Sequence, residues 1–153
     1  MNYRYPSHRI AEIVNAPKCV TGSGKVEPEK KGSHGARFEV TLDLIDGPFV
    51  DLRYFGKAGQ LDNVTSYDAS LLLEQQRVRG IGYSPAARQN FRAKLRVLAG
   101  WHQNICDPNV ATDDPNWNRH EPLLGFSPTD FEDFTRQSAG HWKIDLGWEG
   151  GLL

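Results

Sequence analysis

Two histidines lie in polar stretches of the C-terminal half, and their residue types could support acid–base chemistry. His102 precedes Gln-Asn, and His120 lies in the sequence Asn-Arg-His-Glu. Metal-independent cleavage of RNA needs a base that takes the 2′-hydroxyl proton, an acid that protonates the leaving 5′-oxygen, and a cation that holds the charge on phosphorus. His102 and His120 could be the base and the acid, Arg119 the cation, and Glu121 a group that orients or replaces one histidine.

The same residues allow two other interpretations. Asn, Asp and Pro form turns through local hydrogen bonds, so the polar stretch could be a structured loop in which the two histidines are unrelated. A metal ion held by His102 and His120 with Asp107 or Glu121 is also conceivable, but the spacing fits no metal-ligand pattern well. We therefore predict a site that uses neither a metal nor another cofactor.

A basic stretch without acids precedes these residues. Residues 75–105 contain six basic residues and no Asp or Glu, whereas residues 106–133 contain seven acids. In the stretch 91–97 every second residue is basic, which predicts a strand face with cations about 6.5–7 Å apart, a spacing that suits a nucleic-acid backbone. The residues predicted to bind nucleic acid are Arg77, Arg79, Arg92, Lys94, Arg96 and Trp101. The alternative is a solvated face, or one that pairs with the acidic block.

A second class of function fits the same composition. All four tryptophans lie at or after residue 101, and residues of this type serve in base stacking, in interfaces and, most often, in cores. A non-catalytic inhibitor or accessory protein could use its charged blocks and this Trp-rich C-terminal region to bind a protein partner.

The elements that must position these residues follow from hydrophobic periodicity. Apolar and polar residues alternate in 38–44 and in 50–54, and Asp46-Gly47-Pro48 between them supplies a turn, which predicts a β-hairpin. Further strands are predicted within 66–83, at 91–97 and at 100–105.

The remaining segments are predicted as one helix and two loops. A helix is expected over 127–139, because Ser127 is a good N-cap and Pro128 suits the first helical position. Residues 15–35 are rich in Gly, Pro, Lys and Ser and predict a surface loop. Residues 106–126, with three prolines and several Asn and Asp, predict a long polar loop. The first 14 residues allow either a short helix or a strand.

Length and composition are those of one globular domain. The chain has 153 residues, of which 39% are hydrophobic and 24% charged. We predict a single α+β domain over 1–153, with an antiparallel sheet of about five or six strands and a C-terminal helix packed on it. The net charge of −1 excludes a strongly basic nucleic-acid-binding domain, but not a local basic groove.

The sequence predicts a cytoplasmic protein with no membrane partner. The first residues lack the apolar core of a signal peptide, and no later stretch approaches the roughly 18 apolar residues of a membrane span. Without an export signal, Cys19 and Cys106 are expected to be reduced thiols.

Residues 90–139 follow a recognisable order. A basic strand precedes a short strand that ends near Asp107-Pro108-Asn109; a Pro/Asn-rich loop, Asn118-Arg119-His120 and the helix follow. This layout resembles small bacterial toxins of the TumE type, from toxin–antitoxin pairs, which carry an Asp-x-Asn segment, a loop with His-x-His and a closing helix. Asn118 stands where the first His of that pair would be. The resemblance covers about a third of the chain and implies an α+β, RNA-cleaving toxin neutralised by an antitoxin. RNA and an antitoxin-like protein are thus the expected partners. A homodimer of the chain is a further possible assembly.

Overall fold

The structure is a computed structural model that describes residues 3–21, 26–28, 36–61, 64–84, 88–90, 95–97 and 100–147. Its strands are β1 (Lys18–Thr21), β2 (Val26–Pro28), β3 (Ala36–Leu44), β4 (Leu52–Leu61), β5 (Val64–Leu73), β6 (Gln76–Ser84), β7 (Arg88–Asn90), β8 (Leu95–Val97), β9 (Gly100–Cys106), β10 (Asn118–Pro122) and β11 (Ile144–Asp145). Its helices are α1 (Ser7–Asn15), α2 (Phe131–His141) and the 3₁₀-helix η1 (Pro115–Trp117).

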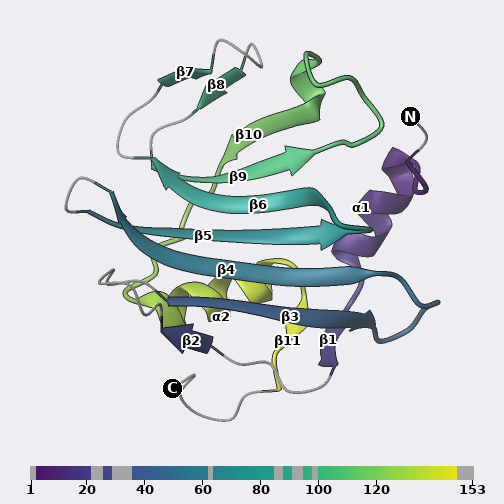
Figure 1. Cartoon of the computed structure of the whole chain (residues 1–153), viewed down its shortest axis with the longest axis horizontal. Coiled ribbons are helices and arrows are strands. Elements are labelled where there is room, and N and C mark those ends of the chain that lie inside the picture. The colour runs from purple at the N-terminus through teal and green to yellow at the C-terminus, as the bar shows by residue number, and fades with distance from the viewer. Residues whose placement is uncertain are drawn as a thin grey trace.

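In this part of the chain nine strands form one sheet, in the order β10-β9-β6-β5-β4-β3-β1-β11, with β2 paired to β3 (Figure 1). Strands β3 to β6 form a meander, and β9 and β10 extend it. Every pair is antiparallel except β1 and β11, which are parallel. Strands β7 and β8 form a separate two-stranded sheet.

The expected antiparallel sheet of about five or six strands is therefore wrong, because the described sheet has nine strands and one parallel pair. The fold is still of the α+β type. The strands of this sheet that were missed, β1, β2, β10 and β11, have only two to five residues each, which is too short for a recognisable alternation. Three of them lie inside the two predicted loops: β1 and β2 within 15–35, and β10 within 106–126.

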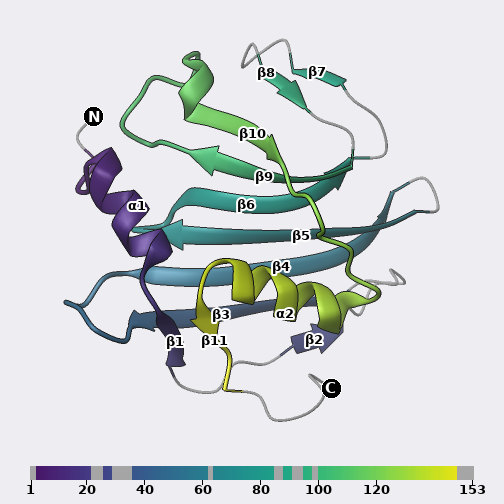
Figure 2. The same ribbon diagram turned by 180° about the vertical axis from the view of Figure 1, so that it is seen from behind.

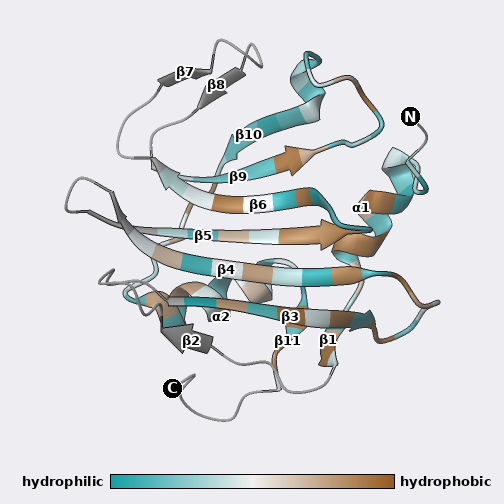
Figure 3. Cartoon of the chain, in the orientation of Figure 1, coloured by the Kyte–Doolittle hydropathy of each residue, from teal (hydrophilic) through white to brown (hydrophobic). Residues whose placement is uncertain are grey.

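The existence of the longer strands was predicted, but not all of their bounds: β4 starts at Leu52 and extends to Leu61, beyond the predicted 50–54. The hairpin of β3 and β4, strands β5 and β6 within 66–83, and β9 are all present. In β3, Phe38, Val40 and Leu42 are buried whereas Glu39 and Thr41 are exposed, and hydropathy changes accordingly along the ribbon (Figure 3). Of the predicted basic strand, 95–97 form β8, and 91–94 lie outside the described residues.

Both α-helices pack on the same face of the sheet, which we call the helix-covered face (Figure 2). Helix α1 buries Ile10, Ile13 and Val14, the weak apolar stripe visible in the sequence. Helix α2 begins three residues later than its predicted first helical position, Pro128. Its N-cap is Asp130, whose carboxylate accepts a hydrogen bond from the Asp133 backbone N–H at 2.7 Å.

Polar groups under the helices have hydrogen-bond partners. The buried Tyr54 hydroxyl donates to the Thr135 carbonyl oxygen at 2.8 Å and contacts the Ser138 hydroxyl, which joins β4 to α2. The ring of Tyr54 packs edge-on against Phe38 and Trp142, with centroids 4.8 and 5.9 Å away. This arrangement fixes α2 over the centre of the sheet.

Lys18 is the buried cation of this face. Its ammonium donates to the carbonyl oxygens of Val14, Ala16 and Trp142, each at 2.7 Å. The acceptors lie at the C-terminal ends of α1 and α2, where helices leave carbonyls without partners. Burial, aided by the charge of Lys143, lowers the pKa of Lys18 to about 8, so the side chain is mostly protonated at neutral pH.

Candidate active site

The opposite face of the sheet, which we call the helix-free face, carries the two predicted histidines. On β10, His120 pairs with Asn104 of β9, and Pro122 pairs with His102. The histidines are thus diagonal neighbours on adjacent strands, within reach of each other's rings. Their ring centroids lie 5.0 Å apart, with an angle of 33° between the planes.

The two rings differ in accessibility. His102 is buried, with 6% of its surface exposed, whereas His120 is half-buried. The Nδ1 atom of His102 lies 3.3 Å from the Gly100 carbonyl oxygen. Since a carbonyl oxygen can only accept, this contact favours the tautomer with the proton on Nδ1.

Two glycines of β6 let polar side chains approach each other across this face. A Cβ at Gly80 would overlap the guanidinium of Arg77, so Arg77 lies directly over Gly80, whose strand partner is Asn104. A Cβ at Gly82 would lie 2.9 Å from Asp68 Oδ1 and 3.7 Å from His102 Nε2. Glycine at these positions makes room for the cluster of Arg77, His102, Asn104 and His120, which we call the histidine cluster.

Arg77 and Asn104 of the histidine cluster each bury a polar atom. Arg77 Nε and Asn104 Oδ1 make no hydrogen bond, as far as the described residues show. A buried polar atom without a hydrogen bond costs about 1–3 kcal/mol, and folded proteins contain few of them. A donor and an acceptor left open beside two imidazoles are suited to a polar ligand.

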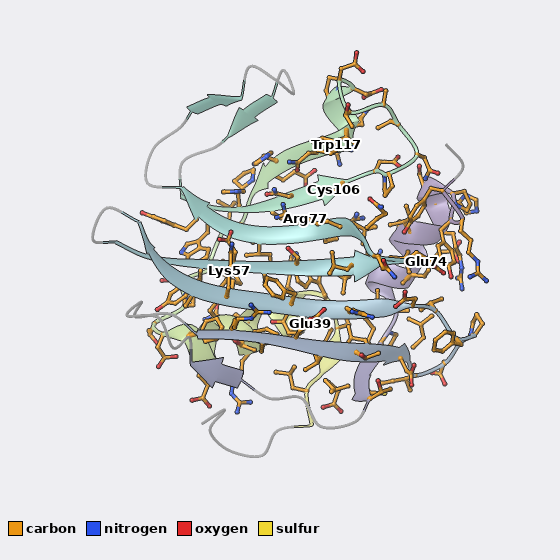
Figure 4. All side chains as sticks on the ribbon, viewed as in Figure 1. Glu39, Lys57, Glu74, Arg77, Cys106 and Trp117 are labelled. Carbon is orange, nitrogen blue, oxygen red and sulfur yellow. The ribbon has the colours of Figure 1, made fainter. Side chains whose placement is uncertain are left out.

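A pocket of about 150 Å³ adjoins the histidine cluster on the same face. It is lined by Gln76, Arg77, Cys106, Pro108, Trp117 and Asn118. Figure 4 shows Arg77, Cys106 and Trp117 close together, on β6, β9 and the segment that leads into β10. Burial raises the pKa of the Cys106 thiol although Arg77 and Arg79 oppose the shift, so Cys106 is a neutral hydrogen-bond donor rather than a nucleophile.

Arg119 and Glu121, predicted to share the site with His120, lie on the other face. Their strand partners are Ile105 and Gln103, whereas His120 pairs with Asn104. Successive side chains of a strand point to opposite faces, so neighbours in sequence are separated by the sheet. Arg119 and Glu121 instead form an ion pair at 3.2 Å with each other.

The residues predicted to bind nucleic acid are divided as well. Arg77 belongs to the histidine cluster, whereas Arg79 is in register with Ile105 on the helix-covered face and donates to the Val78 carbonyl oxygen at 2.7 Å. Trp101 stacks on Phe134, with centroids 5.6 Å apart. Arg92 and Lys94 lie outside the described residues, and Arg96 lies on β8 with its side chain undescribed.

Sequence reasoning missed Asn104, Cys106 and Asn118 as site residues. The one signal that could have indicated them is the Gly-x-Gly of β6, since glycine inside a strand often marks a close approach of other groups. Among the residues that the structure describes, no three or more His, Cys, Asp or Glu side chains are grouped to hold a metal ion. Nor is any described helix long and apolar enough to cross a membrane.

The comparisons with known proteins find no family model, no curated protein and no solved structure that matches this chain.

Proposed function

We propose that this chain is an RNA-directed, metal-independent ribonuclease in which His102 and His120 form the acid–base pair. The observation that carries the proposal is the 5.0 Å separation of the two ring centroids on one face of the sheet. Two imidazoles at this distance can reach the attacking and the leaving oxygen of a single phosphodiester. Arg77 is the cation of the histidine cluster, whereas Arg119 lies on the other face of the sheet.

The reaction assigns one proton transfer to each histidine. His120, the more accessible ring, removes the 2′-hydroxyl proton, and the 2′-oxygen attacks phosphorus. The bond from phosphorus to the 5′-oxygen breaks, and the imidazolium of His102 gives its proton to that oxygen. The products are a 2′,3′-cyclic phosphate and a free 5′-hydroxyl, so the protons balance between the two rings.

Arg77 stabilises the charge that develops on the phosphate oxygens. Its guanidinium lies over Gly80, next to Asn104, and its Nε is still without a partner among the described residues. A donor that is held in place before the reaction stabilises charge without having to reorganise.

The resemblance to TumE-type toxins supports the same reaction. In that setting the protein acts in the cytoplasm of a bacterium, and an antitoxin neutralises it by covering the helix-free face. A homodimer is a further assembly that this setting would allow.

One observation favours a non-catalytic alternative. His102 is only 6% exposed, as expected of a residue that stabilises the sheet rather than one that meets substrate. In this alternative the chain is an inhibitor or accessory protein, and its charged surface binds a protein partner.

The test compares residues of the paired strands β9 and β10 that point to opposite faces of the sheet. His120→Ala and His102→Ala are expected to lower RNA cleavage by about 10²–10⁴-fold. Arg119→Ala and Glu121→Ala are the matched controls and should retain wild-type cleavage. Each variant is measured for cleavage of total RNA, for growth arrest on expression and for melting temperature.

Two outcomes would reject the ribonuclease. One is a wild-type protein that neither cuts RNA nor slows growth, which favours the non-catalytic alternative. The other is a His120→Ala variant that cuts RNA as well as Arg119→Ala does.

A further inference from the structure

We propose that the pocket beside the histidine cluster binds one pyrimidine base, so that the protein cleaves RNA after pyrimidine nucleotides. This inference rests on the proposed function and adds the substrate class. It is argued from the size of the pocket, its walls, and its position relative to His120.

The size of the pocket suits a single six-membered ring. Its volume is about 150 Å³. An apolar protein cavity of about that volume binds benzene, which has the size of a pyrimidine ring. A purine adds a second fused ring, which exceeds this volume and would extend out of the pocket.

The walls offer stacking and hydrogen bonds. Pro108 and Trp117 supply apolar surface, and Trp117 is 37% exposed, so part of its ring is accessible to a base. Stacking of a base on an aromatic side chain stabilises binding by about 1–3 kcal/mol. Gln76 and Asn118 each add an amide, which carries both a donor and an acceptor.

Cys106 orients the Asn118 amide. The Cys106 thiol donates to Asn118 Oδ1 at 3.6 Å. This hydrogen bond fixes the orientation of the amide, so that its NH₂ group can donate to a base. Cytosine and uracil share an acceptor, the carbonyl oxygen at C2. One Asn118 donor can therefore recognise both pyrimidines.

The pocket is placed for a nucleotide whose phosphate is at the histidine cluster. Asn118 and His120 are two residues apart on β10 and lie on the same face, about 6.5–7 Å apart. Arg77 belongs to both places, since it lines the pocket and lies over Gly80 beside Asn104. A base in the pocket would direct its own 3′-phosphate toward His120 and Arg77.

The test measures binding without cleavage. The 3′-monophosphates of cytidine, uridine, adenosine and guanosine, and inorganic phosphate, are titrated into the full chain by calorimetry. Both pyrimidine nucleotides should bind at least about ten-fold more tightly than the purine nucleotides or phosphate. Trp117→Ala should remove about ten-fold of the pyrimidine affinity, as expected for the loss of one stacking contact.

Phe49→Ala is the matched control, because Phe49 is an aromatic residue with 81% exposure in the connection between β3 and β4. It should leave all affinities unchanged. Asn118→Leu provides a second variant should Trp117→Ala lower the melting temperature, and it too should weaken pyrimidine binding. Equal affinity for purines and pyrimidines, or nucleotides that bind no better than phosphate, would overturn the pocket assignment.

Different results would reject the ribonuclease proposal and the pocket proposal. Pyrimidine binding without any RNA cleavage would keep the pocket and reject the ribonuclease. Cleavage without base preference, with no nucleotide binding, would keep the ribonuclease and reject the pocket.

Discussion

On the helix-covered face the buried ammonium of Lys18 donates to three carbonyl oxygens, whereas on the helix-free face Arg77 Nε and Asn104 Oδ1 are buried with no hydrogen bond in the described part of the chain. Both faces belong to the same sheet and both bury polar atoms. Satisfied buried groups stabilise the fold, while unsatisfied ones cost stability and are retained where a ligand can use them. The contrast separates the structural face from the candidate site.

Glycines on the two faces make room for different kinds of side chain. Gly56 makes room for the ring of Phe38, which packs between Tyr54 and Phe131 with centroids 4.8 and 5.9 Å away. Gly80 makes room for the end of the flexible Arg77 side chain. An added methyl group would meet packed aromatic rings in the first case and a movable guanidinium in the second.

The largest expected effect on stability is that of Lys18→Met. Three buried carbonyl oxygens would lose their donor, at about 1–3 kcal/mol each, and the relief of burying a charge offsets part of this cost. We expect the free energy of unfolding to fall by about 3 kcal/mol in a denaturant titration. The exposed Lys57 of the helix-free face is the control, and Lys57→Met should change stability by less than about 0.5 kcal/mol.

The comparison of wild type with Lys18→Met also tests how the free energy of unfolding depends on pH. The pKa of Lys18 is about 8 in the folded chain against an ordinary value of 10.5. Between these pH values Lys18 is more protonated in the unfolded chain than in the folded chain. Its contribution therefore makes the free energy of unfolding rise with pH. The stability difference between wild type and Lys18→Met should therefore widen from pH 8 to pH 10.5. A constant difference would mean that burial does not shift this pKa.

Gly56→Ala should have the next largest effect. The new Cβ would overlap the Phe38 ring, which cannot move without disturbing its aromatic neighbours. Overpacking of this kind costs about 1–3 kcal/mol, and the melting temperature should fall accordingly. Gly59→Ala is the control on the same strand, because no atom lies within 4 Å of its added Cβ. Equal melting temperatures of the two variants would contradict the packing assigned to this face.

The parts of the fold that the sequence predicted depend on local pattern. The alternation in β3 involves residues two positions apart, so it is visible without knowledge of its partners. Strand β11 has two residues and exists because Lys18 and Cys19 of β1 pair with it from far away in the chain. Strand β10 has the composition of a loop, Asn-Arg-His-Glu-Pro, and is a strand because β9 pairs with it.

In the candidate site, too, local sequence identified some residues, whereas strand pairing determines which of them lie together. His102 and His120 were recognised by residue type, but their proximity depends on the register of β9 and β10, which no local pattern encodes. Arg119 and Glu121 were grouped with His120 because they adjoin it in sequence, and a strand directs adjacent side chains to opposite faces. Arg77 joins the cluster only through the β6–β9 pairing.

The smallest expected effect on stability, and the most informative one, is that of Gly80→Ala. The added Cβ would displace the Arg77 guanidinium, whose flexible stem can turn toward solvent, and Ala in a strand recovers about 0.5–1 kcal/mol relative to Gly. We therefore expect the free energy of unfolding to change by less than about 0.5 kcal/mol. In the proposed ribonuclease, RNA cleavage should nevertheless fall by about ten-fold or more, because Arg77 would no longer lie beside the substrate phosphate. Introduced into an Arg77→Ala background, Gly80→Ala should reduce cleavage no further, since both changes remove the same contact. If Gly80→Ala instead lowers the melting temperature as much as Gly56→Ala does, the helix-free face is a packed structural surface like the other, and the contrast between the two faces is lost.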